Sequence, residues 1–390
     1  MRPLILATLP ALLLAGCNAA GEAVGASNGT AAPAGQAQNA RPFAVAEVVK
    51  FDQPWAMTFL PGPGQRALVT ERRGRLLLWR EGAQPVEVEG VPAVDYGGQG
   101  GLGDVVYHDG FVYLSWVEAG PGDTRGAAVG RGRLIAMSAA MPGAPVGYRL
   151  DGFQTIWRQQ PKVGDRGHFG HRLAFSPDGH LFITNGDRQL FTPAQDPGQT
   201  LGKIVRLNAD GSVPADNPWA ARGGVTAQIW TLGHRNPLGI AFDAQGRLWE
   251  HEMGPRGGDE FNLIERGKNY GYPVVSDGSH YDGKDIPDHR TRPEFAAPLI
   301  TWTPVISPAG LIIYSGRMFP QWRGDAFMGG LSGQALVRVD LEGTNARQGD
   351  RWDMGQRIRE VEEGPDGAIY LLEDERGGSG GRLLRLSRPR

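Results

Sequence analysis

The sequence has one cysteine, no large excess of positive or negative charge, and few long apolar runs. Cys17 is the only cysteine among 390 residues, so no disulfide can form within the chain. There are 40 lysines and arginines against 42 aspartates and glutamates, which gives no basic face for nucleic acid. After Cys17, no apolar run approaches the roughly 18 residues needed to span a bilayer. These shortages argue against a disulfide scaffold, a nucleic-acid binder and membrane spans in the mature chain.

The first 16 residues are predicted to be a lipoprotein signal peptide. Arg2 precedes the apolar residues 4–15, and Leu-Ala-Gly-Cys at 14–17 resembles the bacterial lipobox. We expect Cys17 to be lipidated, and Asn18 resembles a signal for sorting to the outer membrane. The expected location is the periplasmic face of that membrane. The protein is expected to contact the membrane only through the lipid anchor. The alternative is an ordinary signal peptide with an incidental cysteine, and a soluble periplasmic protein.

Residues 17–42 are predicted to be a flexible tether, because they are rich in Ala, Gly, Asn and Gln and have almost no large apolar side chains. The remaining residues, 43–390, are predicted to form one all-β domain. They show almost no 3.6-residue periodicity, and short apolar runs follow turns that contain glycine. The high counts of 59 glycines and 29 prolines fit many short strands joined by tight turns.

A turn-and-strand unit recurs along this domain, and unequal insertions hide the repeat. The turn glycines are spaced by 46, 69, 67, 78 and 43 residues; they are Gly64, Gly110, Gly179, Gly246, Gly324 and Gly367. The shortest spacings fit one four-stranded antiparallel blade, and the longer ones fit a blade with inserted loops. Six copies therefore predict a six-bladed β-propeller, in which radial stacking buries faces that a single blade would expose. A β-sandwich is the alternative, but it fits six copies poorly.

The stretch 231–273 carries more polar chemistry than folding requires. Arg235 and Asn236 lie side by side, and an arginine offers a rigid fork of donors to a carboxylate. The loop 254–260, Gly-Pro-Arg-Gly-Gly-Asp-Glu, can turn carbonyl oxygens toward one point, as a calcium ion requires. The alternative is a glycine-rich connection between strands with a surface arginine.

Two histidines, His168 and His171, precede a predicted strand, and Asp187 follows it. A hairpin of this length can bring Asp187 beside His168. A carboxylate orients an imidazole and raises its basicity, as a general base near neutral pH requires. The alternative is that each histidine is an ordinary polar loop residue.

Three further residues suit an anionic, planar ligand. Arg357 and Arg359 alternate, so in a strand they point to one face with nothing acidic between them. Gln99 lies among glycines, where exposed backbone and one amide can approach a flat ligand. The alternative for the arginines is a solvated strand edge.

Taken together, these runs resemble the soluble quinoprotein sugar dehydrogenases, the glucose/sorbosone and aldose sugar dehydrogenase family. The resemblance covers about residues 54–386, and its most specific part is GHRNPLGIAFD followed by GPRGGDEFNLIERGKNYGYP. GHFGHRLAFSPDG, TNGD and QRIREVEEGPDGAIY support it. The resemblance implies a six-bladed propeller that holds pyrroloquinoline quinone (PQQ) and calcium. The implied reaction is oxidation of aldose sugars at C1 to lactones, with electrons passing to an acceptor that the sequence does not identify.

The resemblance also implies roles for single residues. His168 takes the place of the family's base, and Asp187 that of the acid supporting it. The positions that match contacts to the quinone are Gln99, Arg235, Asn236, Tyr281, Arg357 and Arg359. The positions that match calcium ligands are the carbonyls of Gly254 and Pro255 on the cofactor's calcium, and Glu260 and Tyr270 at a second calcium site.

One position departs from the family pattern. Where the family usually has a lysine, near GGLSGQ, this sequence has Ser332. The loss of an ammonium group beside the quinone would weaken cofactor binding or change its redox poise. Two other functions therefore stay open: a propeller that binds a ligand without catalysis, and a calcium-dependent propeller hydrolase that would not need the arginines.

Overall fold

A computed structural model describes residues 41–138, 146–374 and 380–389. All of them lie within one compact unit, Gln38–Arg390. The predicted signal peptide, Cys17 and nearly all of the predicted tether lie outside the described residues. Within the described part of the chain, no helix is long and apolar enough to cross a membrane.

Strands dominate the described residues, which form 24 strands and five short 3-10 helices. The eight-stranded sheet contains β2 (Pro54–Phe59), β3 (Arg66–Glu71), β4 (Arg75–Arg80), β5 (Val86–Glu89), β6 (Leu102–His108), β7 (Phe111–Ala119), β8 (Arg125–Ala136) and β9 (Tyr148–Arg158). Three four-stranded sheets follow: β10 (Gly170–Phe175), β11 (Leu181–Asn185), β12 (Lys203–Leu207) and β13 (Ile229–Leu232); β14 (Pro237–Phe242), β15 (Leu248–Glu252), β16 (Asp259–Ile264) and β17 (Ile300–Trp302); β18 (Pro308–Ile313), β19 (Ala326–Gly330), β20 (Ala335–Glu342) and β21 (Asn345–Asp353). The last sheet joins β22 (Ile358–Glu363), β23 (Ile369–Glu373) and β24 (Arg382–Ser387) to β1 (Ala44–Lys50). The helices are η1 (Thr192–Gln195), η2 (Ala220–Arg222), η3 (Thr226–Gln228), η4 (His289–Thr291) and η5 (Pro320–Trp322).

The predicted all-β class and its four-stranded antiparallel sheets are confirmed. All six turn glycines lie between the first and second strands of a four-strand unit, and their φ angles run from 76° to 86°. A side chain is strained at such angles, which is why glycine recurs there. The eight-stranded sheet consists of two antiparallel four-strand units, which a parallel pairing of β5 with β9 joins at their outer edges.

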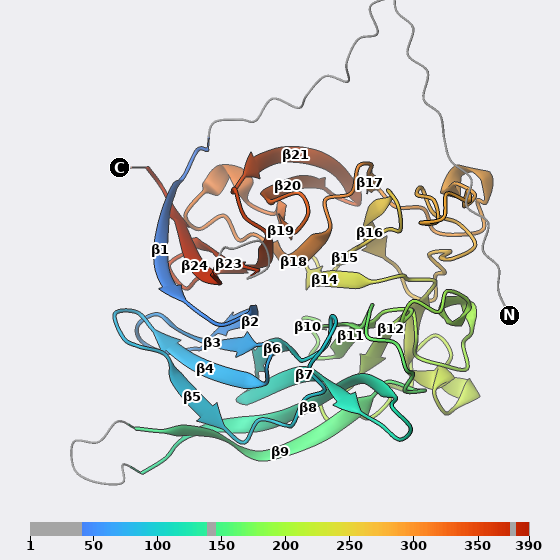
Figure 1. The fold of residues 1–390 in the computed structure, drawn as a ribbon. Coiled ribbons are helices and arrows are strands. Elements are labelled where there is room, and N and C mark those ends of the chain that lie inside the picture. Colours follow the sequence, from blue (N-terminus) through green and yellow to red (C-terminus); the bar gives the residue numbers. More distant parts are fainter. Residues whose placement is uncertain (1–40, 139–145, 375–379, 390) are drawn as a thin grey trace, which may run out of the picture. The chain divides into compact units, whose positions relative to one another are not determined.

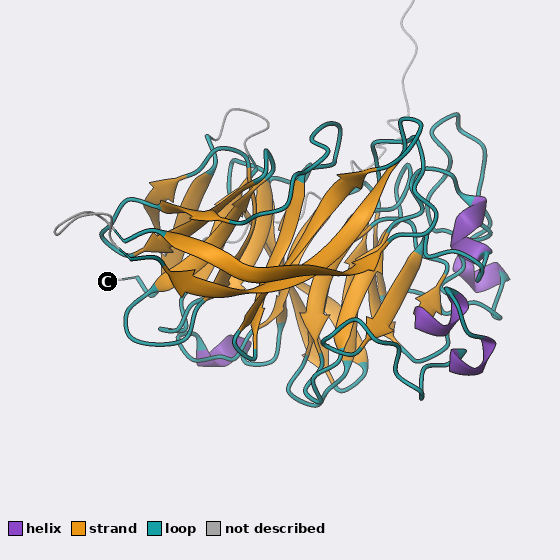
Figure 2. Cartoon of the chain, turned by 90° about the horizontal axis from the view of Figure 1, so that it is seen from below, coloured by secondary structure: helices purple, strands orange, loops and turns teal. Residues whose placement is uncertain are grey.

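The first strands of the units stand around a common centre (Figure 1). Each contacts the next in the order β2, β6, β10, β14, β18 and β22, and β22 contacts β2, so the ring is closed. β1, from the start of the described chain, pairs with β24 from its end and completes the last sheet. Seen from the side, loops cover both edges of the ring, and the short helices lie in peripheral loops (Figure 2).

Large apolar side chains fill the space between neighbouring sheets. Between the units of β14–β17 and β18–β21, for example, Trp249 stacks on Phe261 and packs with Met328 and Val337. Full burial of one such side chain contributes about 1.5–3 kcal/mol. This packing leaves polar residues at the centre and at the loops that lead into the first strands.

Candidate active site

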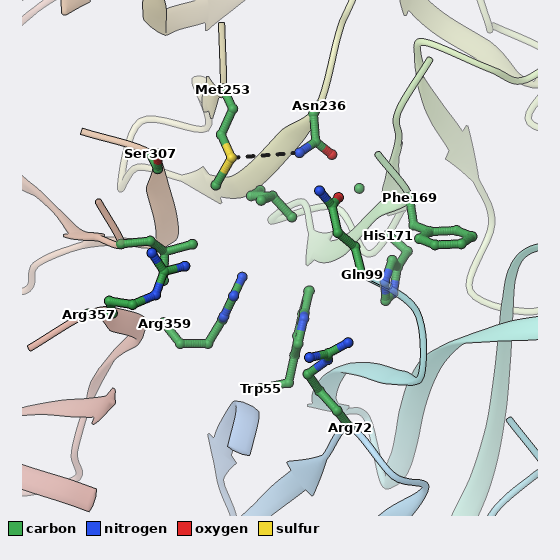
Figure 3. Close-up of a pocket in the computed structure, with 13 residues that line it drawn as sticks. Trp55, Arg72, Gln99, Phe169, His171, Asn236, Met253, Ser307, Arg357 and Arg359 are labelled. Carbon is green, nitrogen blue, oxygen red and sulfur yellow. Dashed lines mark hydrogen bonds between the residues drawn. The ribbon is translucent and has the colours of Figure 1, made fainter. Parts of the chain in front are cut away.

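A pocket opens where the chain enters the innermost strands (Figure 3). Its lining combines three arginines, two amide side chains and several apolar side chains. The lining residues are Trp55, Arg72, Gln99, Phe169, Gly170, His171, Asn236, Leu238, Met253, Ser307, Leu331, Arg357 and Arg359. Four of the six residues predicted to contact a cofactor, Gln99, Asn236, Arg357 and Arg359, thus meet in one pocket.

His168 and Asp187 meet as predicted, because β10 and β11 form the hairpin that separates them. Gly170 pairs with Asn185, and the His168 Nδ1 to Asp187 Oδ1 distance is 2.7 Å. Both side chains are buried. The Gln99 amide oxygen accepts a hydrogen bond from the His168 backbone N–H at 2.8 Å, which ties the histidine loop to the pocket wall. His168 itself is not among the residues that line the pocket.

The charge state of His168 follows from its surroundings. Burial lowers the pKa of the imidazole, Asp187 raises it, and the guanidinium groups of Arg235 and Arg188 lower it. The net direction is down from 6.5, so the ring is neutral at pH 7. With Nδ1–H donated to Asp187, the lone pair on Nε2 is left to accept a proton.

His171 lines the pocket but is a packing residue. Its ring stacks on Trp55 with the centroids 4.9 Å apart, and its Nδ1 lies 2.8 Å from the Ser115 hydroxyl. Burial and neighbouring arginines lower its pKa to about 3. The ring fits only because residue 103 is glycine: a Cβ there would lie 1.9 Å from the imidazole.

Three guanidinium groups reach the pocket. Arg357 and Arg359 do point the same way, but the expectation of nothing acidic between them is wrong, since both donate to Asp374, at 3.1 and 2.8 Å. The β22–β23 hairpin brings Asp374 there, and its backbone N–H also bonds to the Arg357 carbonyl. Arg72, which sequence reasoning missed, follows β3 and donates to the carbonyls of Gly98 and Gly100, beside Gln99. Three guanidinium groups and the Asp374 carboxylate thus meet at this wall of the described pocket.

Glu252 fixes the backbone around Arg235 and Asn236. Its carboxylate accepts hydrogen bonds from both backbone N–H groups, one of them 3.1 Å long. The Arg235 guanidinium then donates to the carbonyls of Met253 and Gly254, at 2.9 and 2.6 Å. It also lies 3.3 Å from the hydroxyl of Tyr281, whose side chain is 72% exposed. Arg235 and Tyr281 thus form a separate contact next to the pocket, and the Gly254 carbonyl is already engaged by a cation.

A buried acidic cluster lies behind this turn. His234, Glu250 and Glu252 each place a ligand atom within 4.8 Å of the others. The β15–β16 register pairs Glu252 with Glu260 and Glu250 with Asn262, so four oxygen-bearing side chains share one face. Among the described residues, Glu250 Oε1 and Asn262 Oδ1 are buried without a hydrogen-bond partner.

Tyr270 lies against the same cluster. Its ring stacks on His234 with the centroids 4.8 Å apart, and its carbonyl accepts a hydrogen bond from His289 at 3.1 Å. Burial and the nearby Glu252 raise the pKa of both Glu250 and Glu260 well above the ordinary value, since the carboxylates cannot all carry charge together. The structure therefore gathers Glu260 and Tyr270, as predicted, and adds three ligand candidates that sequence reasoning missed.

Comparison with known proteins gives the context of this site. The sequence model of the family described as Glucose / Sorbosone dehydrogenase matches residues 51–385. The chain belongs to that family. It is 39% identical over 351 residues to the aldose sugar dehydrogenase YliI of Escherichia coli, covering 87% of this chain and 91% of that protein.

Solved structures of the glucose/sorbosone dehydrogenase family have the same fold. The apo-form of the soluble aldose sugar dehydrogenase from Escherichia coli superimposes with a TM-score of 0.79 at 37% identity, covering 89% of this chain and 100% of that one. The PQQ-bound form of the aldose sugar dehydrogenase from Streptomyces coelicolor gives 0.69 at 27% identity, covering 88% and 98%. The predicted family resemblance is confirmed.

Ser332, at the position where the resemblance implies a lysine, lies next to a residue of the pocket. The Ser332 hydroxyl is 2.8 Å from that of Ser307, which lines the pocket. Residue 332 therefore contributes no positive charge. The arginines that line the described pocket are Arg72, Arg357 and Arg359. No sequence motif marks Arg72, and only the turn after β3 brings it to Gln99.

Proposed function

We propose that this protein is a PQQ-dependent dehydrogenase that oxidises aldose sugars at C1 to lactones. The observation that carries the proposal is the convergence of three guanidinium groups and two amides on one pocket, beside a buried His–Asp pair. Family membership supports an oxidoreductase acting on sugars, and the PQQ-bound relative supports the cofactor.

The pocket's donor set fits a quinone with three carboxylates. Arg357 and Arg359 supply planar donors for carboxylates, and Gln99 and Asn236 supply amides for carbonyl or ring atoms. Arg72 lies beside Gln99, where it donates to the carbonyls of Gly98 and Gly100. Bound PQQ supplies a two-electron acceptor for a hydride.

In this mechanism His168 is the general base. Its Nε2 takes the proton of the C1 hydroxyl, while Asp187 keeps the Nδ1–H in place and stabilises the imidazolium that forms. Arg235 fixes the neighbouring loop through the carbonyls of Met253 and Gly254. The electrons leave to an acceptor that is still to be identified.

We also propose a calcium ion at the buried acidic cluster. Its proposed ligands are the carboxylates of Glu250, Glu252 and Glu260 and the carbonyl of Tyr270. Buried oxygens without hydrogen-bond partners and raised carboxyl pKa values are what a hard cation with oxygen ligands would relieve. For the cofactor's own calcium, the carbonyls of Gly254 and Pro255 remain the proposed ligands. The Gly254 carbonyl would share that role with its bond to Arg235.

Calcium removal is expected to lower both activity and thermal stability. A ligand bound only to the folded state stabilises it by about 2.7 kcal/mol at 100 times its Kd, so exhaustive chelation should lower Tm by a few °C. Glu260→Gln should lower Tm without calcium addition restoring it, whereas Glu118→Gln, at a carboxylate outside the cluster, should keep the full response. Unchanged Tm and activity after chelation would remove calcium from the proposal.

The cofactor proposal is tested by titrating purified apo-protein with PQQ and calcium and following dye reduction by a panel of aldoses. We expect saturable PQQ binding and dye reduction that needs all three components. Calcium binding without PQQ binding and without turnover would favour a non-catalytic binding protein. Calcium-dependent hydrolysis of esters or lactones without PQQ would favour the hydrolase.

For the fold, we propose counting the eight-stranded sheet as two blades, which gives a six-bladed β-propeller. The six turn glycines and the ring of six first strands support this count. The parallel β5–β9 pairing is then a contact between the outer edges of neighbouring blades.

For location, we propose a lipid anchor on Cys17 at the periplasmic face of the outer membrane. Stable anchoring needs more than one acyl chain, which a lipoprotein cysteine carries. Cys17→Ser should move the protein from the membrane to the soluble fraction, as judged by fractionation and by labelled palmitate incorporation. Membrane retention without acylation would contradict this reading.

A further inference from the structure

Arg188 is a fully buried arginine directly behind the His–Asp pair. It follows Asp187 in the chain, and none of its surface is exposed to solvent. Its Nε donates to the Gly167 carbonyl at 2.8 Å, and its Nη2 donates to the Asp165 carbonyl. Its Nη1 donates to the Arg125 carbonyl at 3.1 Å. One side chain thus binds the loop that carries His168 on one side and β8 on the other.

The guanidinium of Arg188 has polar but uncharged hydrogen-bond partners. In the described part of the chain its hydrogen bonds all end on carbonyl or amide oxygens, and its guanidinium lies 3.7 Å from the Phe169 ring centroid. Arg125 and Arg206, by contrast, each bond to a carboxylate. A buried charge that forms no direct ion pair costs several kcal/mol, although the nearby carboxylates of Asp165 and Asp187 offset part of that cost for Arg188. Groups that lower stability in this way collect at functional sites.

The loop that Arg188 holds has an unfavourable backbone conformation. His168 and His171 both have positive φ, 48° and 52°, and Gly170 between them has 65°. Such conformations cost of order 1–3 kcal/mol each for residues with side chains, and they persist only where the surroundings fix them. The Gly167 carbonyl, which accepts from Arg188, belongs to the peptide that enters His168.

We propose that Arg188 is a positioning residue: its guanidinium holds the peptide leading into His168 so that the imidazole meets Asp187. The assignment of His168 as the base rests on the proposed function, but the placement of the ring can be tested without turnover. The charged groups that act on His168 are Asp187, Arg235 and Arg188. Arg188 therefore has a second effect, because its charge opposes protonation of the ring.

Arg188→Lys and Arg188→Met separate the two effects. Lysine keeps the charge but cannot span the Asp165, Gly167 and Arg125 carbonyls with one planar fork, so geometry is lost and charge retained. Methionine loses both. Arg206→Met is the matched control, because Arg206 is also buried over an aromatic ring, Trp230, but on β12 outside the pocket.

The readouts are kcat, KM, the pH profile of kcat/KM, and the His168 pKa in apo-protein by NMR, assigned with His168→Ala. Both Arg188 variants should lose roughly 10²-fold in kcat, as a misplaced catalytic group does. The pKa of His168, and with it the acidic limb, should fall in Arg188→Lys, because the ring loses its contact with Asp187 while the cation stays. It should fall less in Arg188→Met, because loss of the cation offsets part of that change. Arg206→Met should lower Tm only.

Two results would overturn the proposal. One is a native kcat and a native His168 titration in a folded Arg188→Lys variant. The other is that Arg188→Met and Arg206→Met differ only in Tm. If the native protein oxidises no sugar, the NMR titration still decides whether Arg188 positions His168, so failure of the proposed function is recognised separately.

Discussion

His168→Ala is expected to lower kcat by roughly 10²–10⁴-fold, the contribution of a well-placed general base, while PQQ affinity survives. The expectation rests on the 2.7 Å contact between His168 and Asp187 and on an imidazole that burial keeps neutral. PQQ affinity should persist because the guanidinium groups of Arg72, Arg357 and Arg359, not His168, face the pocket. Two quantities are measured: kcat with one aldose that the native protein oxidises readily, and the affinity for PQQ.

His171→Ala and Asp187→Asn are the controls for this result. His171→Ala should keep most of kcat and lose stability, because the ring packs between Trp55 and Ser115. Asp187→Asn should reduce kcat by less than His168→Ala, because the imidazole keeps its place and loses only the negative charge of the neighbouring carboxylate. If His171→Ala is the inactive enzyme and His168→Ala the active one, the base is misassigned.

The assignment of His168 as the base also predicts how activity depends on pH. A neutral imidazole is the active base, so activity should fall on the acidic side, with a midpoint below 6.5. Asp187 raises the His168 pKa, so Asp187→Asn should move that limb to still lower pH. A limb that moves to higher pH in Asp187→Asn would show that another group titrates.

Local patterns in the sequence predicted what local chemistry determines. A hairpin turn needs positive φ, so the six turn glycines could be read directly, and each does join the first two strands of a unit. The approach of His168 to Asp187 needed only one hairpin of known length. The alternation of Glu250, Glu252, Glu260 and Asn262 was equally readable, and only the register of β15 with β16 was missing.

Contacts between distant segments left no local signal. β1 pairs with β24, Ala44 opposite Ser387, and nothing near either strand specifies the other. Arg72 reaches the pocket only through the turn after β3, and Asp374 reaches Arg357 and Arg359 only through the β22–β23 hairpin. These contacts depend on closure of the ring. The repeat predicts that the ring closes, but it does not predict which residues meet when it does.

Closure of the ring also concentrates contacts on one side chain, Arg172. From β10 its Nε donates to the Leu238 carbonyl of β14, and its Nη2 to the Arg359 carbonyl of β22. Its Nη1 pairs with Asp104 of β6 and Glu360 of β22, and its guanidinium lies 4.0 Å from the Trp55 ring centroid on β2. One buried arginine therefore joins five of the six first strands.

A second cavity begins at this arginine and continues along the same strands. Its charged lining residues are Arg172, Asp104, Glu360 and Glu362, and the other lining residues lie on β2, β6, β10, β14 and β18. Burial raises the pKa of Glu360 to about 7 and that of Asp104 above its ordinary value, while Arg172 lowers both. The arginine thus holds two buried carboxylates that would otherwise repel each other.

Arg172→Met is expected to lower the free energy of unfolding by about 3–5 kcal/mol, the cost of leaving buried charges without a partner. Urea unfolding at pH 8 measures it. Arg149→Met, which removes an exposed pair with Asp151, should cost less than about 1 kcal/mol under the same conditions.

The pH dependence of that loss identifies its cause. The folded pKa of Glu360 is raised, so its carboxyl favours the folded state fully below about 4.5, and this advantage disappears as the pH rises through about 7. Without Arg172 that pKa rises further, so the deficit of Arg172→Met should be smaller at pH 5 than at pH 8. Glu360→Gln in the Arg172→Met background should recover part of the loss at pH 8, because a neutral amide needs no counter-ion. A deficit that is equal at both pH values and unaffected by Glu360→Gln would mean that Arg172 stabilises the ring by packing on Trp55 and not by its charge.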